Sequence, residues 1–214
     1  MKKTLLALIL VALLATLGWF AFSMGSGDAV ALVNGEKISR ADFETFQTEV
    51  AQQQGVDLVT LDDQMKEQLQ TLAIDELVAR TLLRQAVEDS NIAISDEDID
   101  VQLATIKGQF GDEATFYEAL TAQGLTEKEF RAQIKTELAT QAYFDQNVDL
   151  SGILATDEEI ATKYDELATE GSDAPPLEEV REQVRSIVVQ EKERAIITTH
   201  VQELAEGATI EVLI

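Results

Sequence analysis

The stretch that decides the fold is DDQMKEQLQTLAIDELVARTLLRQAVEDS, residues 62–90. Its apolar residues recur at helical spacing, which predicts one long helix. They fall on two neighbouring stripes, Met65, Leu69, Leu72, Ala79, Leu83 and Ala86 on the first and Ile74, Leu77, Val78 and Leu82 on the second. A helix that is apolar over so much of its circumference needs several partners to cover it. The rest of the chain is therefore expected to pack around this helix.

Start and stop signals divide the chain into further helices. Thr60 with Asp63 is taken as the start of the long helix, and Asn91 as its left-handed stop. The same hydroxyl-then-acid pattern recurs at Ser39/Asp42, Ser95/Asp98, Thr126/Glu129 and Thr156/Glu159. Together these signals predict helices over about 40–54, 62–90, 96–110, 113–123, 127–147, 157–169 and 177–206.

Short strands are expected near both ends of this helical region. Residues 29–33 are strand-like, Asn34-Gly35 is a strong hairpin signal, and residues 36–38 would form the returning strand. The alternating run 209–213 predicts a last strand, which we expect to pair with residues 29–33 because each alone leaves an unpaired edge. The predicted fold is all-α with a minor β-sheet.

The N-terminal residues 1–23 resemble a targeting segment. Lys2 and Lys3 precede an uncharged run over residues 4–22, whose 19 residues are close to the ~20 that span a bilayer. Two interpretations stay open, an uncleaved signal anchor in the inner membrane and a cleaved signal peptide. In both, the acidic body is exported. Residues 24–28 are interpreted as a linker.

Composition excludes several classes of function. The 214 residues carry a net charge of −24, which disfavours nucleic acid as a partner. The absence of cysteine excludes disulfides and zinc–thiolate sites, and a single histidine, His200, excludes a histidine metal cluster. Ser39 and Ser95 are better explained as helix caps than as nucleophiles. We therefore predict no catalytic residues, no metal and no cofactor, and a protein that is not an enzyme.

Aromatic residues are the most suggestive candidates for a binding surface. They gather between residues 96 and 147, at Phe110, Phe116, Tyr117, Phe130, Tyr143 and Phe144. One interpretation is that they fill the core of a small helical subdomain. The other is that some of them line an apolar groove for unfolded chains. The sequence does not separate the two.

Three stretches of the chain resemble one family. VALVNGEKISRADFE (30–44), LLRQAVEDSNIAISDEDIDVQL (82–103) and LTEKEFRAQIKTELATQAYFDQNV (125–148) are similar to the N-terminal chaperone domain of the SurA, PrsA and PpiD family. Residues 177–214 also resemble that family's last helix and strand. The resemblance implies a helical chaperone domain over residues 29–214, with a first part at 29–169 that the segment 177–214 completes.

The chain departs from the family at one place. In the family, a parvulin prolyl isomerase domain usually lies before the last helix, where this sequence has only a short linker at residues 170–176. The resemblance therefore implies an envelope chaperone that binds unfolded or newly exported proteins on the periplasmic side, as in outer-membrane protein assembly, without ATP and without isomerase activity. The alternative is a membrane-anchored scaffold for one envelope partner, and a homo- or hetero-dimer stays open in either case.

Overall fold

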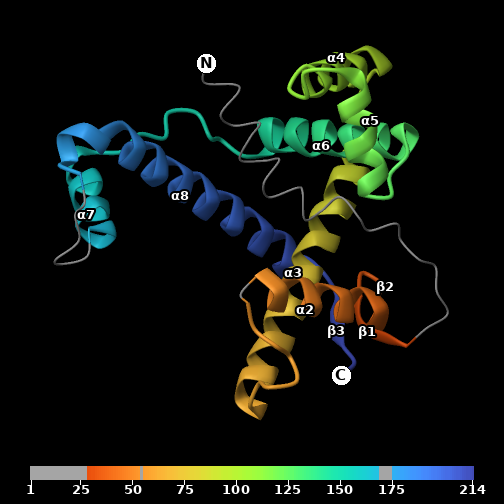
Figure 1. The fold of residues 1–214 in the computed structure, drawn as a ribbon. Coiled ribbons are helices and arrows are strands. Elements are labelled where there is room, and N and C mark those ends of the chain that lie inside the picture. The colour runs from red at the N-terminus through yellow and green to blue at the C-terminus, as the bar shows by residue number, and fades with distance from the viewer. Residues whose placement is uncertain (1–27, 54, 169–174) are drawn as a thin grey trace. The chain divides into compact units, whose positions relative to one another are not determined.

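The computed structural model describes residues 28–53, 55–168 and 175–214, whose elements are labelled in Figure 1. In chain order these elements are β1 (Ala29–Val33), β2 (Glu36–Ser39), α2 (Arg40–Gln53), α3 (Asp63–Asp89), α4 (Asp96–Lys107), α5 (Glu113–Ala122), α6 (Glu127–Asn147), α7 (Asp157–Leu167), α8 (Leu177–Glu206) and β3 (Ile210–Val212). The prediction of a mainly helical fold with a minor sheet is confirmed. The targeting segment predicted over residues 1–23 lies outside the described residues, and within those residues no helix is both long and apolar enough to cross a membrane.

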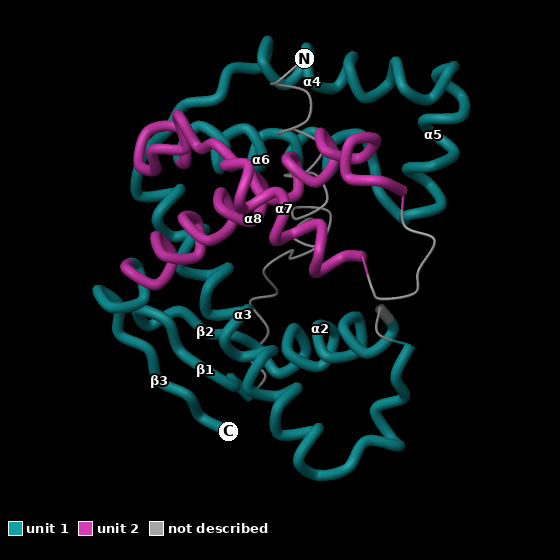
Figure 2. The backbone as a smooth tube through the Cα atoms, turned by 90° about the vertical axis from the view of Figure 1, so that its left-hand side faces the viewer, with its two compact units in different colours: residues 1–143, 204–214 teal, residues 144–203 magenta. Residues whose placement is uncertain are grey.

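The chain forms two compact units, coloured separately in Figure 2. Unit 1 comprises residues 1–143 and 204–214, and unit 2 comprises residues 144–203. The break predicted at residues 170–176 lies inside unit 2, between α7 and α8. The C-terminal end of α8 and β3 belong to unit 1, so the two ends of the helical region meet in one sheet.

The sheet has the order β2-β1-β3, with both neighbours antiparallel to β1. Ala31 pairs with Val212 and Val33 with Ile210, so the predicted pairing between residues 29–33 and the last strand is confirmed. The β1–β2 turn has positive φ at Asn34 (52°) and Gly35 (85°), the geometry of a tight type I′ hairpin. Asn34 also bonds to Thr209. Its backbone N–H donates to the Thr209 carbonyl at 2.8 Å, and its side-chain Oδ1 accepts from the Thr209 backbone N–H at 2.9 Å.

One face of the sheet packs against α2 and α3. Val30, Ala31 and Val33 are fully buried, and with Phe43, Phe46 and the middle of α3 they form one apolar core. Polar contacts fix the position of α3 beside the hairpin, because Arg84 donates to both oxygens of the Glu36 carboxylate and Gln85 donates to the Val33 carbonyl at 3.1 Å. The β1–β2 hairpin, the last strand and α3 are thus held together around β1.

The predicted start of α3 is wrong in its cap residue, and the predicted stop is right. The helix begins at Asp63, but its cap is Asp62, whose carboxylate accepts from the Met65 amide at 2.8 Å. Thr60 is not the cap, because a turn at Asp57 holds both its amide and its hydroxyl. The stop is confirmed, since Asn91 has φ 53°.

The cover of α3 also differs from the prediction. Its buried residues are Ala73, Leu77, Val78 and Leu82, whereas Met65 and Leu72 are 48% and 50% exposed. The apolar stripe continues into the first turns of the helix, but α2 and β1 contact its middle and end. Helical periodicity predicts which face of a helix is apolar, but it does not predict whether other segments of the same chain bury that face.

Unit 2 contains a helical hairpin that ion pairs hold together. Ile160 on α7 is fully buried, and Val184 and Val188 on α8 are also buried. Asp157 pairs with Arg181 at 2.7 Å and Lys163 with Glu191 at 3.0 Å, each between α7 and α8. Glu159 pairs with Lys192 at 2.6 Å and also caps α7 by accepting from the Thr156 amide at 2.7 Å. The start predicted at Thr156/Glu159 is a complete capping box.

Candidate functional site

The aromatic residues of α4–α6 form a cluster around Phe116. Its side chain is 1% exposed, and three rings meet it edge-on: Phe110 at 5.6 Å, Tyr117 at 5.3 Å and Phe130 at 5.6 Å between centroids. Edge-to-face contacts of this kind add to the energy of burial. Ile99, Leu103, Leu120 and Ile134 complete the core beneath these rings. The structure therefore brings together four of the six aromatic candidates.

Lys107 covers the cluster with a polar layer. Its ammonium lies 5.1 Å from the Phe116 ring centroid and 4.9 Å from that of Tyr117, within cation–π range. It also donates to the Tyr117 hydroxyl at 3.1 Å and to Glu127 at 3.4 Å, and the Tyr117 hydroxyl donates to Glu127. The bond from Lys107 to Tyr117 raises the pKa of Lys107, and the bond that the Tyr117 hydroxyl donates to Glu127 lowers the pKa of Glu127. The layer ties α4, α5 and α6 together through charge-assisted bonds.

The six candidates differ in exposure. Phe116, Tyr143 and Phe144 are buried, Phe130 is half-buried, and Phe110 and Tyr117 are 36% and 39% exposed. Tyr143 ends the first part of unit 1 and Phe144 opens unit 2, where its ring meets His200 edge-on at 6.4 Å. Of these residues, Phe110 and Tyr117 are the two with enough accessible ring to contact another molecule without unfolding.

A second apolar surface lies at the start of α3, where the sequence did not place a site. Residues from the end of α2, the connecting loop and α3 line a hollow of about 210 Å³, which we call the α3 groove: Ala51, Val56, Leu61, Met65, Gln68, Leu69 and Leu72. The signal was present in the sequence as the stripe Met65, Leu69 and Leu72, which we assigned to the core. The turn at Asp57 bonds Thr60, the residue predicted as the cap of α3, and it belongs to the loop whose Val56 and Leu61 line this groove.

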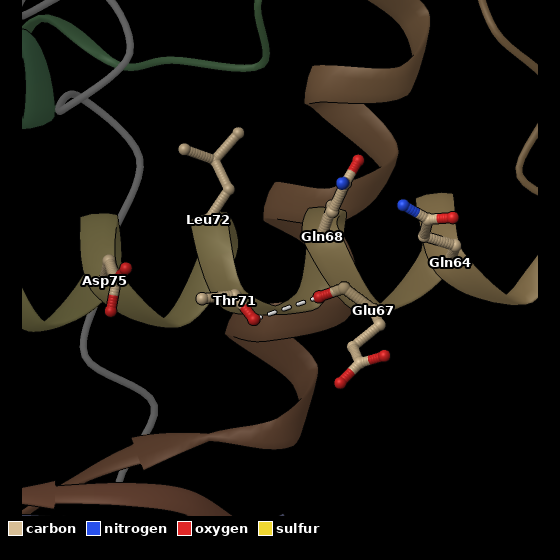
Figure 3. A pocket seen from close by; sticks show the side chains of 6 residues that line it. All are labelled: Gln64, Glu67, Gln68, Thr71, Leu72 and Asp75. Carbon is tan, nitrogen blue, oxygen red and sulfur yellow. Dashed lines mark hydrogen bonds between the residues drawn. The ribbon is translucent and has the colours of Figure 1, made fainter.

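The groove continues into a polar hollow along the same helix. Figure 3 shows Gln64, Gln68 and Leu72 projecting side by side from α3, with Glu67, Thr71 and Asp75 beneath them. Gln68 and Leu72 line both hollows. The Thr71 hydroxyl is held by the Glu67 carbonyl at 3.0 Å, the ordinary bond of a threonine to the preceding turn. This surface offers apolar contact, side-chain amides and negative charge, but no group arranged for catalysis.

No cluster of three or more metal-ligating side chains occurs within residues 28–53, 55–168 and 175–214. His200, the chain's one histidine, lies on α8 with its Nδ1 3.9 Å from a Glu203 oxygen and its side chain 17% exposed.

Comparison with known proteins gives this architecture a family. The model of the SurA-like N-terminal domain matches residues 1–144, two thirds of the chain. The chain belongs to this family. The resemblance inferred from residues 30–44, 82–103 and 125–148 is confirmed.

The relatives of this SurA-like domain include foldases and a chaperone. The foldase protein PrsA of Clostridium kluyveri is 35% identical over 156 residues, which cover 63% of this chain and 44% of PrsA. The chaperone SurA of Pseudoalteromonas translucida is 28% identical over 134 residues, covering 61% of this chain and 30% of SurA. The chain thus matches less than half the length of either relative.

Among solved structures, the fold is similar to a SurA-like chaperone of Campylobacter jejuni. The TM-score is 0.49 at 13% sequence identity, covering 87% of this chain and 99% of the other.

Proposed function

We propose that this protein is an envelope chaperone that binds unfolded or newly exported polypeptides, independently of ATP and without prolyl isomerase activity. The observation that carries the proposal is membership of the SurA-like N-terminal domain family, whose similar proteins include PrsA foldases and a SurA chaperone. The targeting segment predicted over residues 1–23 supports a site of action on the periplasmic side of the inner membrane.

Accessible apolar surface supports the same function. A chaperone that accepts many sequences needs adaptable apolar groups that stay exposed when no client is bound. Phe110 and Tyr117 provide such groups in the α4–α6 cluster, and Met65 and Leu72 provide them on α3. The net charge of −24 keeps a protein with exposed apolar groups soluble and separate from other copies.

The test is suppression of aggregation. A denatured outer-membrane protein is diluted into buffer without nucleotide, and light scattering is recorded with increasing amounts of the purified chain. We expect scattering to fall as the chain approaches a several-fold excess, and we expect a similar fall with an unrelated unfolded protein. Suppression of one client alone would favour the dedicated scaffold, and no suppression at any ratio would overturn the chaperone function.

A further inference from the structure

The α3 groove is an apolar surface that the described part of the chain leaves open. Ala51 forms its floor at 5% exposure, and Val56, Leu61 and Leu69 are half-buried around it. Met65 and Leu72 stand at its sides, 48% and 50% exposed. Methionine and leucine side chains that water still reaches gain free energy when an apolar group covers them. The volume of about 210 Å³ suits a few side chains at a time.

The surroundings of the groove are strongly acidic. Between residues 49 and 75 the sequence has one cation, Lys66, against the carboxylates of Glu49, Asp57, Asp62, Asp63, Glu67 and Asp75. Two of these carboxylates are held in place by backbone bonds, Asp57 to the Val59 amide at 2.9 Å and Asp62 to the Met65 amide at 2.8 Å. Asp57 and Asp62 directly follow or precede residues of the groove in sequence (Val56, Leu61), so a ligand at this site meets fixed negative charge close to its apolar lining.

Charge and size together select the occupant. A second copy of this chain would bring the same acidic rim and a net charge of −24 to the contact, and like charges oppose that association. A stable dimer also buries about 800 Å² on each partner, more than a hollow for a few side chains provides. An apolar peptide segment with lysine or arginine on its flanks complements both the floor and the rim.

We propose that the α3 groove binds short apolar segments of unfolded polypeptides that carry flanking lysine or arginine residues. This inference rests on the proposed chaperone function, and it adds the surface and the class of segment that the surface selects. Met65 and Leu72 cover the apolar part of the segment, and the carboxylates at Asp57, Asp62, Asp63 and Glu67 attract its flanks. Because the rim is exposed, its contribution weakens as the salt concentration rises.

The test uses the full chain and three labelled peptides, measured by fluorescence anisotropy. One peptide has a leucine- and valine-rich centre with lysine flanks, the second has the same centre with glutamate flanks, and the third has a serine centre with lysine flanks. We expect the first to bind at least ten-fold more tightly than either of the others, and we expect that advantage over the glutamate peptide to shrink at high salt.

Two variants locate the site. The double variant M65S/L72S removes the exposed apolar groups and should weaken binding of the lysine-flanked peptide about ten-fold, slightly less than the full burial of one large apolar side chain. V101S is the matched control, since Val101 is 62% exposed on α4 and lies outside the groove. We expect V101S to bind like the unaltered chain, and both variants to melt within a degree or two of it because the altered side chains are exposed.

Several results would overturn the proposal. Equal affinity for lysine- and glutamate-flanked peptides would remove the role of the rim, and unchanged binding by M65S/L72S would place the peptide elsewhere. A concentration-dependent dimer that M65S/L72S abolishes would assign the groove to a second copy. In the last two cases suppression of aggregation by the unaltered chain would leave the chaperone function standing. Tight peptide binding without any such suppression would instead overturn that function and make the groove a site for a dedicated partner.

Discussion

Asn34 shows how much one residue of the hairpin turn contributes. Its positive φ forms the turn, its Oδ1 accepts from the Thr209 amide, and its Nδ2 donates to Gln85 Oε1 on α3 at 2.8 Å. The sequence predicted the turn from the Asn-Gly pair. It could not predict the two side-chain bonds, because their partners are 51 and 175 residues away.

We expect N34A to lower the free energy of unfolding by about 2 kcal/mol. Roughly 1 kcal/mol comes from placing alanine at the positive φ that asparagine tolerates better, and the rest from two exposed hydrogen bonds. N34G keeps the backbone freedom and loses only the bonds, so it should cost about half as much. Urea unfolding measures both variants. Equal losses in N34A and N34G would show that the turn conformation contributes nothing.

Glu159 links acid sensitivity to the helical hairpin of unit 2. The bond from Lys192, followed by the bonds at the Thr156 cap, lowers the pKa of Glu159 to about 2. A carboxylate with a lowered pKa stabilises the folded state at pH values above its unfolded pKa, and that stability is lost as pH falls through the folded pKa.

The variant E159Q should therefore melt at a lower temperature than the unaltered chain at neutral pH. The difference should shrink as pH falls from about 4.5 toward about 2, because both side chains are then uncharged. Calorimetry across this range measures it. Glu193, whose pKa burial raises, titrates in both proteins and cancels from the difference. A difference that stays constant down to pH 2 would contradict the lowered pKa.

At the scale of the element, α3 shows which properties of a helix can be predicted from its sequence and which cannot. Its extent was predicted to within a residue at each end, because the apolar spacing and the stop at Asn91 are local features. Which of its apolar residues are buried was not predicted, because the burial of Met65 and Leu72 depends on where α2 ends and how the loop at Asp57 turns. The same limit applies to the candidate site, since the groove is made of residues whose sequence pattern is that of a core.

The sequence also predicts the α4–α6 aromatic cluster only in part. Its helices and the start signals at Ser95 and Thr126 were predictable, and so was the gathering of aromatic residues between α4 and α6. Phe116 and Tyr117 are adjacent in sequence, yet one is buried and the other exposed. That difference depends on the rotation of α5 against its neighbours, which the short helix alone does not determine.

Paired substitutions in this cluster should separate core from surface. F116A removes a buried ring that three others contact, and we expect it to cost about 3–5 kcal/mol or to prevent folding. F110A should cost at most about 1 kcal/mol, since that ring is 36% exposed. Thermal melts with circular dichroism provide the measurement. If F110A also weakens suppression of aggregation while melting normally, the ring is a client contact; a large loss of stability in F110A would assign it to the core.

At the scale of the whole molecule, acidity and apolar exposure act together. Forty acidic residues against 16 basic ones give repulsion between copies, which opposes the self-association that exposed apolar groups promote. Under the proposed function, we expect the same acidity to favour basic clients over acidic ones, with the rim of the α3 groove contributing to that preference.

The whole chain also bears on catalysis. Residues 168–176 separate α7 from α8, far fewer than the ~50 residues of a small domain, so a domain of that size does not fit between these two helices. His200, the chain's one histidine, lies on α8 with its ring against Phe144. We expect the purified chain to leave the cis–trans exchange of a proline peptide at its uncatalysed rate, tens of seconds or slower at 25 °C. A protease-coupled assay measures the rate, with H200A as the matched variant. Acceleration that survives a second purification would contradict the prediction, and its loss in H200A would place the catalytic group on α8.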